Sequence, residues 1–485
     1  MIRPFTLSEI THELQGILLR GDSGADTTIT GISIDTRTLE QGNLFVAIKG
    51  PRFDGHAYAD QAEVAGAAAV VVQVPVPGLG IPQIQVQDTD QALGRLGQFN
   101  RECFHGPVVA VTGTCGKTSV KEMLASVFEQ VGKVLATRGN LNNAYGVPLT
   151  LFRLEADQQH AVIELGTSSP GEIDYITRLT EPDVAIITNA SENHLKDLLT
   201  LEGVIHEKGF ILDGLKKNGI AVLNLDDPSF QRWKQRALRQ PDRKVLSFSL
   251  NKREADVFAS EVSSTSEGMS FRLHIVREGV EKQSIVNLSF WGKHQVQNAC
   301  CVAAAASAVG LGLDIIVSGL ENARPYQQRG TRYPLSEGLL VIDESYNASP
   351  IATLAAIDQL ADCEGKTIMV LGDMLDLGEV SEARHVDVGE YAATRHIDCF
   401  AAYGEATVAS VDAFSRELRG AQRGMKAKHL NDKEALSNWV KSRIQAFREQ
   451  QADCPITVLV KGSNGMKMLD VVRSLVGSEF KGERC

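Results

Sequence analysis

The stretch from Val108 to Ser119 constrains this chain of 485 residues more than any other. It reads Val-Val-Ala-Val-Thr-Gly-Thr-Cys-Gly-Lys-Thr-Ser, and apolar residues then recur at helical spacing as far as Phe128. Four apolar residues before a glycine turn predict a buried strand, and the later spacing predicts a helix. Backbone N–H groups at a helix start bind anions, and a Lys-Thr pair there is typical of loops that hold nucleotide phosphates. The stretch therefore predicts a phosphate-binding loop.

Within this loop, Lys117 would reach the outer phosphates of ATP and Thr118 would ligate Mg²⁺. The usual loop has a glycine where this chain has Val111, so the general motif is met only in part. The alternative is an ordinary strand, turn and helix with a chance lysine. The loop residues that we assign to ATP are Gly113, Thr114, Cys115, Gly116, Lys117, Thr118 and Ser119.

Length and charge limit the classes of protein that this chain can form. A chain of 485 residues is too long to fold around a single hydrophobic core, so we expect two to four domains. The net charge of −11 argues against a nucleic-acid-binding surface. We expect neither a signal peptide nor membrane insertion, because no apolar run is long enough to span a bilayer. The eight cysteines are scattered without a C-x-x-C pair, which fits reduced thiols in a cytoplasm.

Alternating strands and helices predict an α/β fold in three units, which cover residues 1–86, 87–323 and 324–485. The first is small, with strands near residues 32–34 and 44–48 around a polar turn and a helix over 57–67. The second carries the phosphate-binding loop on a parallel sheet. The third reads as a Rossmann-like sheet, whose strands at 339–342, 367–371 and 456–460 present polar residues at one edge.

Two residues of the central unit suggest metal chemistry beside the loop. Glu164 ends the apolar strand that begins near Ala161, and a buried carboxylate needs a partner. Mg²⁺ next to a triphosphate would supply one, although a structural ion pair is the alternative. His194 follows the strand 184–187, at the sheet edge where ligands gather.

Several motifs together resemble the Mur ligase superfamily, which also includes folylpolyglutamate synthase. They are Thr-Gly-Thr-x-Gly-Lys-Thr at 112–118, Asp-Thr-Arg at 35–37, Asp-Gly-His at 54–56, Arg-Gly-Asn-Leu-Asn-Asn at 138–143 and Val-Lys-Gly-Ser at 460–463. The resemblance covers nearly the whole chain. It implies a first domain that binds the uridine nucleotide, a central ATPase domain and a C-terminal ligase domain.

The resemblance also implies roles for single residues. The UDP-muramoyl peptide would contact Ser33, Asp35, Arg37, Asp54, His56, Asn140 and Asn143. Metal ligands would be Thr118, Glu164, His194 and Lys208, with Lys208 carrying a carbamate. Further ATP contacts would be His294, Asn298, Arg329, Asp343, Tyr346 and Asn347. Lys117, His194 and Lys208 would serve catalysis.

Motifs in the third unit favour one branch of the family. Asp-x-Ser-Tyr-Asn-Ala-x-Pro at 343–350 and Gly-Asp-Met-x-x-Leu-Gly at 372–378 resemble the ligases that add D-alanyl-D-alanine to UDP-N-acetylmuramoyl-tripeptide. Residues 167–169 and Asn464 depart from that pattern, and these departures leave a different amine open as an alternative. The resemblance implies a monomeric cytoplasmic enzyme that uses ATP and Mg²⁺. A relative with another substrate, such as folylpolyglutamate synthase, and an ATP-driven switch that forms no bond are the alternatives.

Overall fold

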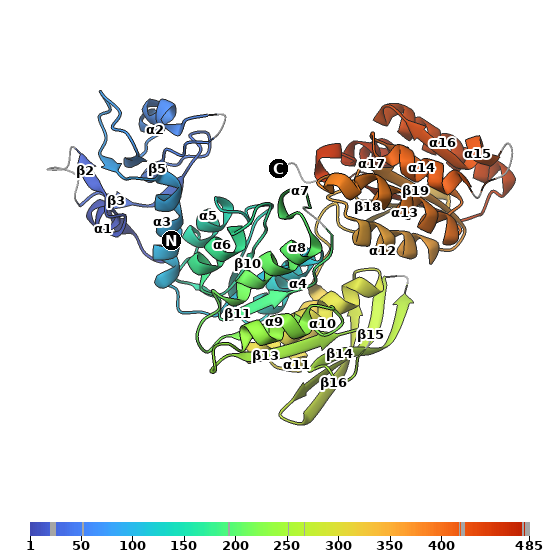
Figure 1. Ribbon diagram of the computed structural model, residues 1–485, viewed down its shortest axis with the longest axis horizontal. Coiled ribbons are helices and arrows are strands. Elements are labelled where there is room, and N and C mark those ends of the chain that lie inside the picture. Colours follow the sequence, from blue (N-terminus) through green and yellow to red (C-terminus); the bar gives the residue numbers. More distant parts are fainter. Residues whose placement is uncertain are drawn as a thin grey trace.

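The computed structural model describes residues 1–19, 26–50, 53–192, 195–250, 252–265, 267–416, 418, 422–477 and 480. Three α/β units follow one another along the chain, from blue through green and yellow to orange-red in Figure 1. Their main sheets have five, nine and six strands among these residues. The predicted α/β class and three-unit architecture are confirmed.

The first unit holds the five-stranded sheet, with the order β2-β7-β6-β5-β4. Its elements are β1 (Phe5–Thr6), α1 (Leu7–Glu13), β2 (Ile17–Leu19), β3 (Thr28–Ile29), β4 (Gly31–Ser33), β5 (Asn43–Val46), the 3-10 turn η1 (Gly55–Tyr58), α2 (Ala59–Val64), β6 (Ala69–Val72) and β7 (Gln83–Gln85). Strands β4 and β5 pair in parallel, so the polar segment between them is a crossover and closes no hairpin. The predicted helix over 57–67 is shorter and begins as a 3-10 turn.

The central unit is built on the nine-stranded sheet, with the order β16-β15-β14-β13-β12-β11-β8-β10-β9. Its elements are α3 (Thr89–Glu102), β8 (Val108–Thr112), α4 (Lys117–Glu129), β9 (Lys133–Ala136), α5 (Gly146–Phe152), β10 (Gln158–Glu164), α6 (Glu172–Thr180), β11 (Val184–Ile187), α7 (Leu195–Leu198), α8 (Leu201–Gly209), η2 (Phe210–Leu212), β12 (Ile220–Asn224), α9 (Phe230–Ala237), β13 (Lys244–Ser249), β14 (Val257–Thr265), β15 (Gly268–Arg277), β16 (Val280–Leu288), α10 (Lys293–Ala308) and α11 (Leu313–Asn322). The strands from β9 to β14 run parallel, and β15 and β16 extend the sheet antiparallel.

Strand β8, which leads into the phosphate-binding loop, is buried on both faces. Val109 and Val111 pack in the core under α4, α10 and α11, whereas Val108 and Ala110 pack under α5, α6, α8 and α9. A parallel strand covered on both faces is apolar at every position, which explains the unbroken run in the sequence. This double burial fixes the position where the loop leaves the sheet.

The third unit is a Rossmann-like sheet with the order β17-β18-β22-β19-β20-β21, in which only the edge strand β17 is antiparallel. Its elements are β17 (Thr331–Pro334), η3 (Ser336–Gly338), β18 (Leu339–Glu344), α12 (Pro350–Ala361), β19 (Lys366–Gly372), η4 (Gly378–Val380), α13 (Ser381–Thr394), β20 (Cys399–Tyr403), α14 (Thr407–Arg416), α15 (Gln422–Lys426), β21 (Ala427–Leu430), α16 (Lys433–Gln450), β22 (Ile456–Lys461), η5 (Asn464–Met466) and α17 (Leu469–Val476). Helices α12, α13 and α14 cover one face, and α16 and α17 the other. The three predicted strands lie side by side in parallel, so their polar ends share one edge.

Helix α3 connects the first two units. Its residues Leu93 and Leu96 pack with Phe5 and Ile10 of the first unit, and Gly97 lies against Pro148 of the central unit. The predicted boundary at residue 86 stays a prediction, as does the one at residue 323. Among the described residues, no helix is both long enough and apolar enough to cross a membrane.

Candidate active site

A cleft of about 500 Å³ lies between the central and third units. The phosphate-binding loop and the start of α10 form one wall, and the segments that follow β18 form the other. Of the thirteen residues predicted to bind ATP, all but Gly113 and Asp343 line it. Residues predicted from four separate segments of the sequence thus meet in one place.

The loop owes its shape to glycines at two positions. Gly116 has a left-handed backbone with φ of 84° and precedes α4 directly. A Cβ atom on Gly116 would lie 2.6 Å from Oδ1 of Asn298, and one on Gly113 would lie 1.8 Å from Oγ1 of Thr188. Glycine alone fits both places, because it tolerates positive φ and carries no side chain.

The segment after β11 braces the loop from below. The side-chain amide of Asn189 accepts a hydrogen bond from the Cys115 N–H at 3.0 Å and donates one to the Cys115 carbonyl at 3.1 Å. Thr188 Oγ1 donates to the same carbonyl at 2.6 Å, and the Ser191 N–H donates to Thr114 Oγ1 at 3.0 Å. Sequence reasoning missed Thr188 and Asn189, and their place at the carboxyl end of a parallel strand was the available signal.

Lys117 points back over the loop that carries it. Its ammonium group donates to the carbonyls of Gly113 at 2.8 Å and Thr114 at 3.3 Å. Burial lowers the pKa of Lys117, and the nearby Glu164 opposes that shift. A phosphate group in the loop would offer this lysine an anionic partner in place of two carbonyls.

Thr118 and Glu164, two of the predicted metal ligands, are in direct contact. Thr118 Oγ1 donates to Glu164 Oε2 at 2.9 Å, and Asn142 Nδ2 donates to Glu164 Oε1 at 2.8 Å. Glu164 is 2% exposed. Asn142 was not among the predicted site residues, whereas Asn143 was; Asn143 Oδ1 accepts from the Gly146 N–H at 2.8 Å at the start of α5.

Lys208 lies near the end of α8, buried beside the loop. Burial, and next the positive charge of Lys117, lower its pKa from 10.5 to about 7. At neutral pH a substantial fraction of its amine is therefore uncharged, as nucleophilic attack by nitrogen requires. The long interval in sequence between Lys117 and Lys208 hides this proximity.

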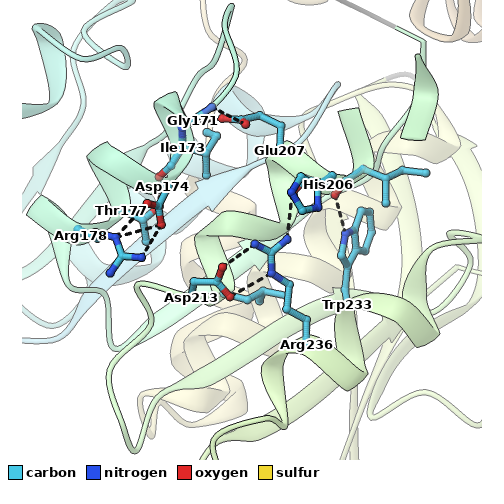
Figure 2. Close-up of polar contacts among 12 residues, drawn as sticks. Gly171, Ile173, Asp174, Thr177, Arg178, His206, Glu207, Asp213, Trp233 and Arg236 are labelled. Carbon is cyan, nitrogen blue, oxygen red and sulfur yellow. Dashed lines mark hydrogen bonds and ion pairs between the residues drawn. The ribbon is translucent and has the colours of Figure 1, made fainter. Parts of the chain in front are cut away.

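A network of hydrogen bonds, part of it buried, holds the helix that carries Lys208 (Figure 2). The Glu207 carboxylate accepts hydrogen bonds from the N–H groups of Gly171 at 2.8 Å and Ile173 at 2.9 Å, at the start of α6. From α9, Trp233 Nε1 donates to the Ile205 carbonyl at 3.2 Å, and Arg236 Nη1 donates to the His206 carbonyl at 2.9 Å. Helix α8 is thus tied to two neighbouring helices just before Lys208.

Asp343 lies in β18, next to the last residue of the strand, Glu344, which lines the cleft. Its Oδ1 accepts from the Ser345 N–H at 3.0 Å, and burial raises the pKa of its carboxyl group to about 6. Above it, the Arg329 guanidinium stacks on the Tyr346 ring at 4.0 Å, and Lys461 Nζ donates to the Asn347 carbonyl at 3.1 Å.

His194 falls outside the described residues. The five residues predicted to bind the uridine end are all in the first unit, away from this cleft. There, Arg37 forms an ion pair with Asp35, and His56 Nδ1 lies 2.6 Å from Asp54 Oδ1 while its Nε2 accepts from the Gln73 N–H at 2.9 Å.

Comparison with known proteins identifies the family. Three Mur ligase models match in chain order: the Mur ligase family catalytic domain over residues 28–101, the Mur ligase middle domain over 111–306 and the glutamate ligase domain over 328–464. The UDP-N-acetylmuramoyl-tripeptide--D-alanyl-D-alanine ligase of Escherichia coli K12 is 41% identical over 97% of this chain and 98% of its own length. The chain belongs to the Mur ligase family.

Other relatives of this Mur ligase agree in name and in fold. The Bacillus subtilis ligase of the same name is 34% identical over 98% of each chain. The crystal structure of MurF from Acinetobacter baumannii has a TM-score of 0.88 with 32% identity and covers 98% of this chain and 99% of that one. MurF from Thermotoga maritima, solved in complex with ADP, has a TM-score of 0.77 with 25% identity over 93% of this chain and 97% of that one. A Mycobacterium tuberculosis folylpolyglutamate synthase, at 15% identity and a TM-score of 0.61, shares the fold alone.

Proposed function

We propose that this chain is the ATP-dependent ligase that adds D-alanyl-D-alanine to UDP-N-acetylmuramoyl-tripeptide, which gives the pentapeptide precursor of peptidoglycan. One observation carries the proposal: relatives named for this reaction match the chain over nearly its whole length, one of them at 41% identity over 97% of this chain. A match to the nucleotide domain alone would leave the acceptor and the amine open. The match here includes the first and third units, where the two substrates would bind.

The reaction would proceed in two displacements. A terminal carboxylate oxygen of the tripeptide attacks the γ-phosphorus of ATP, ADP leaves, and an acyl phosphate forms. The dipeptide amine then attacks the acyl carbon, inorganic phosphate leaves with the bridging oxygen, and the new amide nitrogen loses a proton. Lys117 would neutralise charge on the transferred phosphoryl group. The third unit would cover the acyl phosphate and exclude water, which would otherwise hydrolyse it.

Oxygen ligands for Mg²⁺ are present beside the loop. The Glu164 carboxylate and the Thr118 hydroxyl lie 2.9 Å apart at its end. Among the described residues no group of three or more His, Cys, Asp or Glu could hold a metal ion by itself. That arrangement fits Mg²⁺, which binds through one or two protein oxygens together with phosphates and water. When bound, the ion would offset the negative charge of the triphosphate.

Lys208 is suited to carry a carbamate on its side-chain nitrogen. Its uncharged amine would form a bond to the carbon of CO₂ and release a proton, which yields an anion with two oxygen atoms. The lowered pKa of Lys208 supports this reaction, because it makes the uncharged amine available near neutral pH. We assign His194 to the same metal site on the family resemblance. We further propose that the enzyme works in the cytoplasm as a monomer and binds the UDP end in its first unit.

Substrate-dependent ADP release tests the function. We expect ADP release only when UDP-N-acetylmuramoyl-tripeptide is present, and one peptide bond per ADP when D-alanyl-D-alanine is added. ADP release that ignores both substrates would favour an ATP-driven switch. Ligation of the tripeptide to a different amine would overturn only the dipeptide assignment. Turnover of a folate acceptor in place of the tripeptide would favour the alternative superfamily member.

A further inference from the structure

A charged contact joins the third unit to the central unit beside the cleft. Arg384 on α13 donates from Nε to Glu192 Oε2 at 2.5 Å and from Nη2 to Glu192 Oε1 at 3.1 Å. The two residues are separated by 192 positions in the sequence. Asp387, one turn further along α13, accepts from Arg384 Nη1 at 2.6 Å. Two parallel hydrogen bonds with a third fixing the guanidinium define the geometry more closely than a single contact would.

Apolar residues lie beside this ion pair. Leu198 of α7 and Val204 of α8 are buried and pack with Val380 of η4, the turn that immediately precedes α13. Two elements that adjoin the ion pair in sequence therefore also meet across the unit boundary. The contact has an apolar centre and a charged rim, the usual composition of an interface between folded units.

On the central unit, the segment that carries Glu192 is hydrogen-bonded to the phosphate-binding loop. Glu192 follows Ser191, whose N–H donates to Thr114 Oγ1 at 3.0 Å, while Thr114 Oγ1 donates to the Ser191 carbonyl at 3.2 Å. A second contact, Cys115 Sγ to Ser349 Oγ at 3.3 Å, joins the loop to the third unit at the other side. One peptide bond thus separates the ion pair from a residue hydrogen-bonded to the loop.

We propose that Arg384 and Glu192 are positioning residues that hold the third unit against the nucleotide loop in the arrangement that turns over. This inference rests on the proposed function. Neither residue would touch the reacting atoms. Their contact would keep the cleft closed while the acyl phosphate exists, so that the amine reaches it before water does.

Charge reversal tests this role in the full-length enzyme. Arg384→Glu and Glu192→Arg each place like charges together, and we expect each to lower kcat at least about fivefold, as the loss of a roughly 1 kcal/mol ion pair implies. Each should also raise the number of ADP molecules released per peptide bond formed. The double variant, Arg384→Glu with Glu192→Arg, restores opposite charges and should recover most of both losses. The neutral variants Arg384→Met and Glu192→Gln should show smaller losses in the same direction.

A matched control separates this pair from surface charge in general. Arg416 and Glu390 form an ion pair at 2.9 Å within the third unit, with both side chains more than half exposed. Arg416→Glu should leave kcat and the ADP-to-peptide ratio unchanged. Single reversals that leave both quantities at the wild-type level, or a double variant no better than the singles, would overturn the proposal.

Solution scattering of the ligand-free chain keeps this test independent of the assigned substrates. Arg384→Glu should increase the radius of gyration relative to wild type, and the double variant should return it. An unchanged radius of gyration in the single variants would overturn the positioning role of Arg384 and Glu192 even if ligation is confirmed. An enzyme that ligates neither substrate yet shows this pattern of radii would refute the proposed function and leave the positioning role standing.

Discussion

Lys117 and Lys208 lie close enough across the candidate active site for the charge of one to lower the pKa of the other. Burial contributes the larger part of the shift, and the charge of Lys117 adds to it. Together the two effects lower the pKa of Lys208 to about 7. Two lysines in one buried site repel each other while both are charged. Conversion of Lys208 to a negatively charged carbamate would replace that repulsion with attraction to Lys117. The pairing of the two lysines therefore favours the carbamate.

The rate of ligation should therefore depend on CO₂ and on pH. The uncharged Lys208 amine becomes the major form as pH rises through about 7. We expect enzyme depleted of CO₂ to recover activity when CO₂ is restored. At equal concentrations of dissolved CO₂, it should recover faster at roughly pH 8 than at roughly pH 6. Recovery kinetics in sealed, degassed buffer measure this. Equal recovery rates at both pH values would contradict a role for the uncharged amine.

The lowered pKa of Lys208 should also make the stability of the ligand-free protein depend on pH. The pKa of Lys208 falls from 10.5 to about 7 in the folded state. Below about pH 7 the folded protein therefore buries a charged lysine, and the free energy of unfolding is lowered by the full penalty for burying that charge. This penalty fades as pH rises from 7 toward 10.5, because the folded state has already released the proton. Lys208→Met should therefore unfold at a higher denaturant concentration than wild type at pH 7, and the difference should shrink by roughly pH 9.5. A constant difference across that range would contradict the lowered pKa.

Asn142 should act on the metal through Glu164. Its amide donates to Glu164 Oε1 at 2.8 Å, and partners of a metal-binding carboxylate commonly change metal affinity 10- to 100-fold. We expect Asn142→Ala to raise the Mg²⁺ concentration for half-maximal rate by about tenfold. The KM for D-alanyl-D-alanine should stay near its wild-type value. A shift in that KM with an unchanged Mg²⁺ requirement would place Asn142 at the amine site instead.

Glu207 should be needed for the stability of the region around Lys208. Glu207→Ala leaves two N–H groups at the start of α6 without their acceptor (Figure 2), which should lower the free energy of unfolding by about 1–3 kcal/mol. Glu202→Ala on the same helix is the control, because its ion pair with Arg232 is exposed and should contribute no more than about 1 kcal/mol. Chemical denaturation of both variants measures the difference. Equal destabilisation by the two substitutions would argue against the network.

The sequence predicted the parts of the site that are local. Lys117 and Thr118 stand in a strand, turn and helix pattern, and Glu164 is a carboxylate at the end of an apolar strand, so their neighbourhood follows from short-range geometry. Family motifs supplied His294 and Arg329, which do line the cleft.

Contacts made only in the folded chain could not be read in that way. Asn189 and Glu207 look like ordinary polar residues until the fold places them under the loop and against α6. The pairing of Arg384 with Glu192 likewise depends on how two units meet, and no spacing in the sequence records that arrangement. The sequence predicted a turn between β4 and β5, but the connection is a crossover. A short polar segment looks the same in the sequence whether it closes a hairpin or crosses between parallel strands.

Oxygen transfer tests the central claim most directly, namely that ATP activates the terminal carboxylate of the peptide. The tripeptide is labelled with ¹⁸O in that carboxylate, and the enzyme is supplied with unlabelled ATP and D-alanyl-D-alanine. An acyl phosphate predicts that each inorganic phosphate released carries one ¹⁸O atom, because the bridging oxygen leaves with phosphorus. Phosphate free of ¹⁸O, with the pentapeptide formed, would contradict this mechanism.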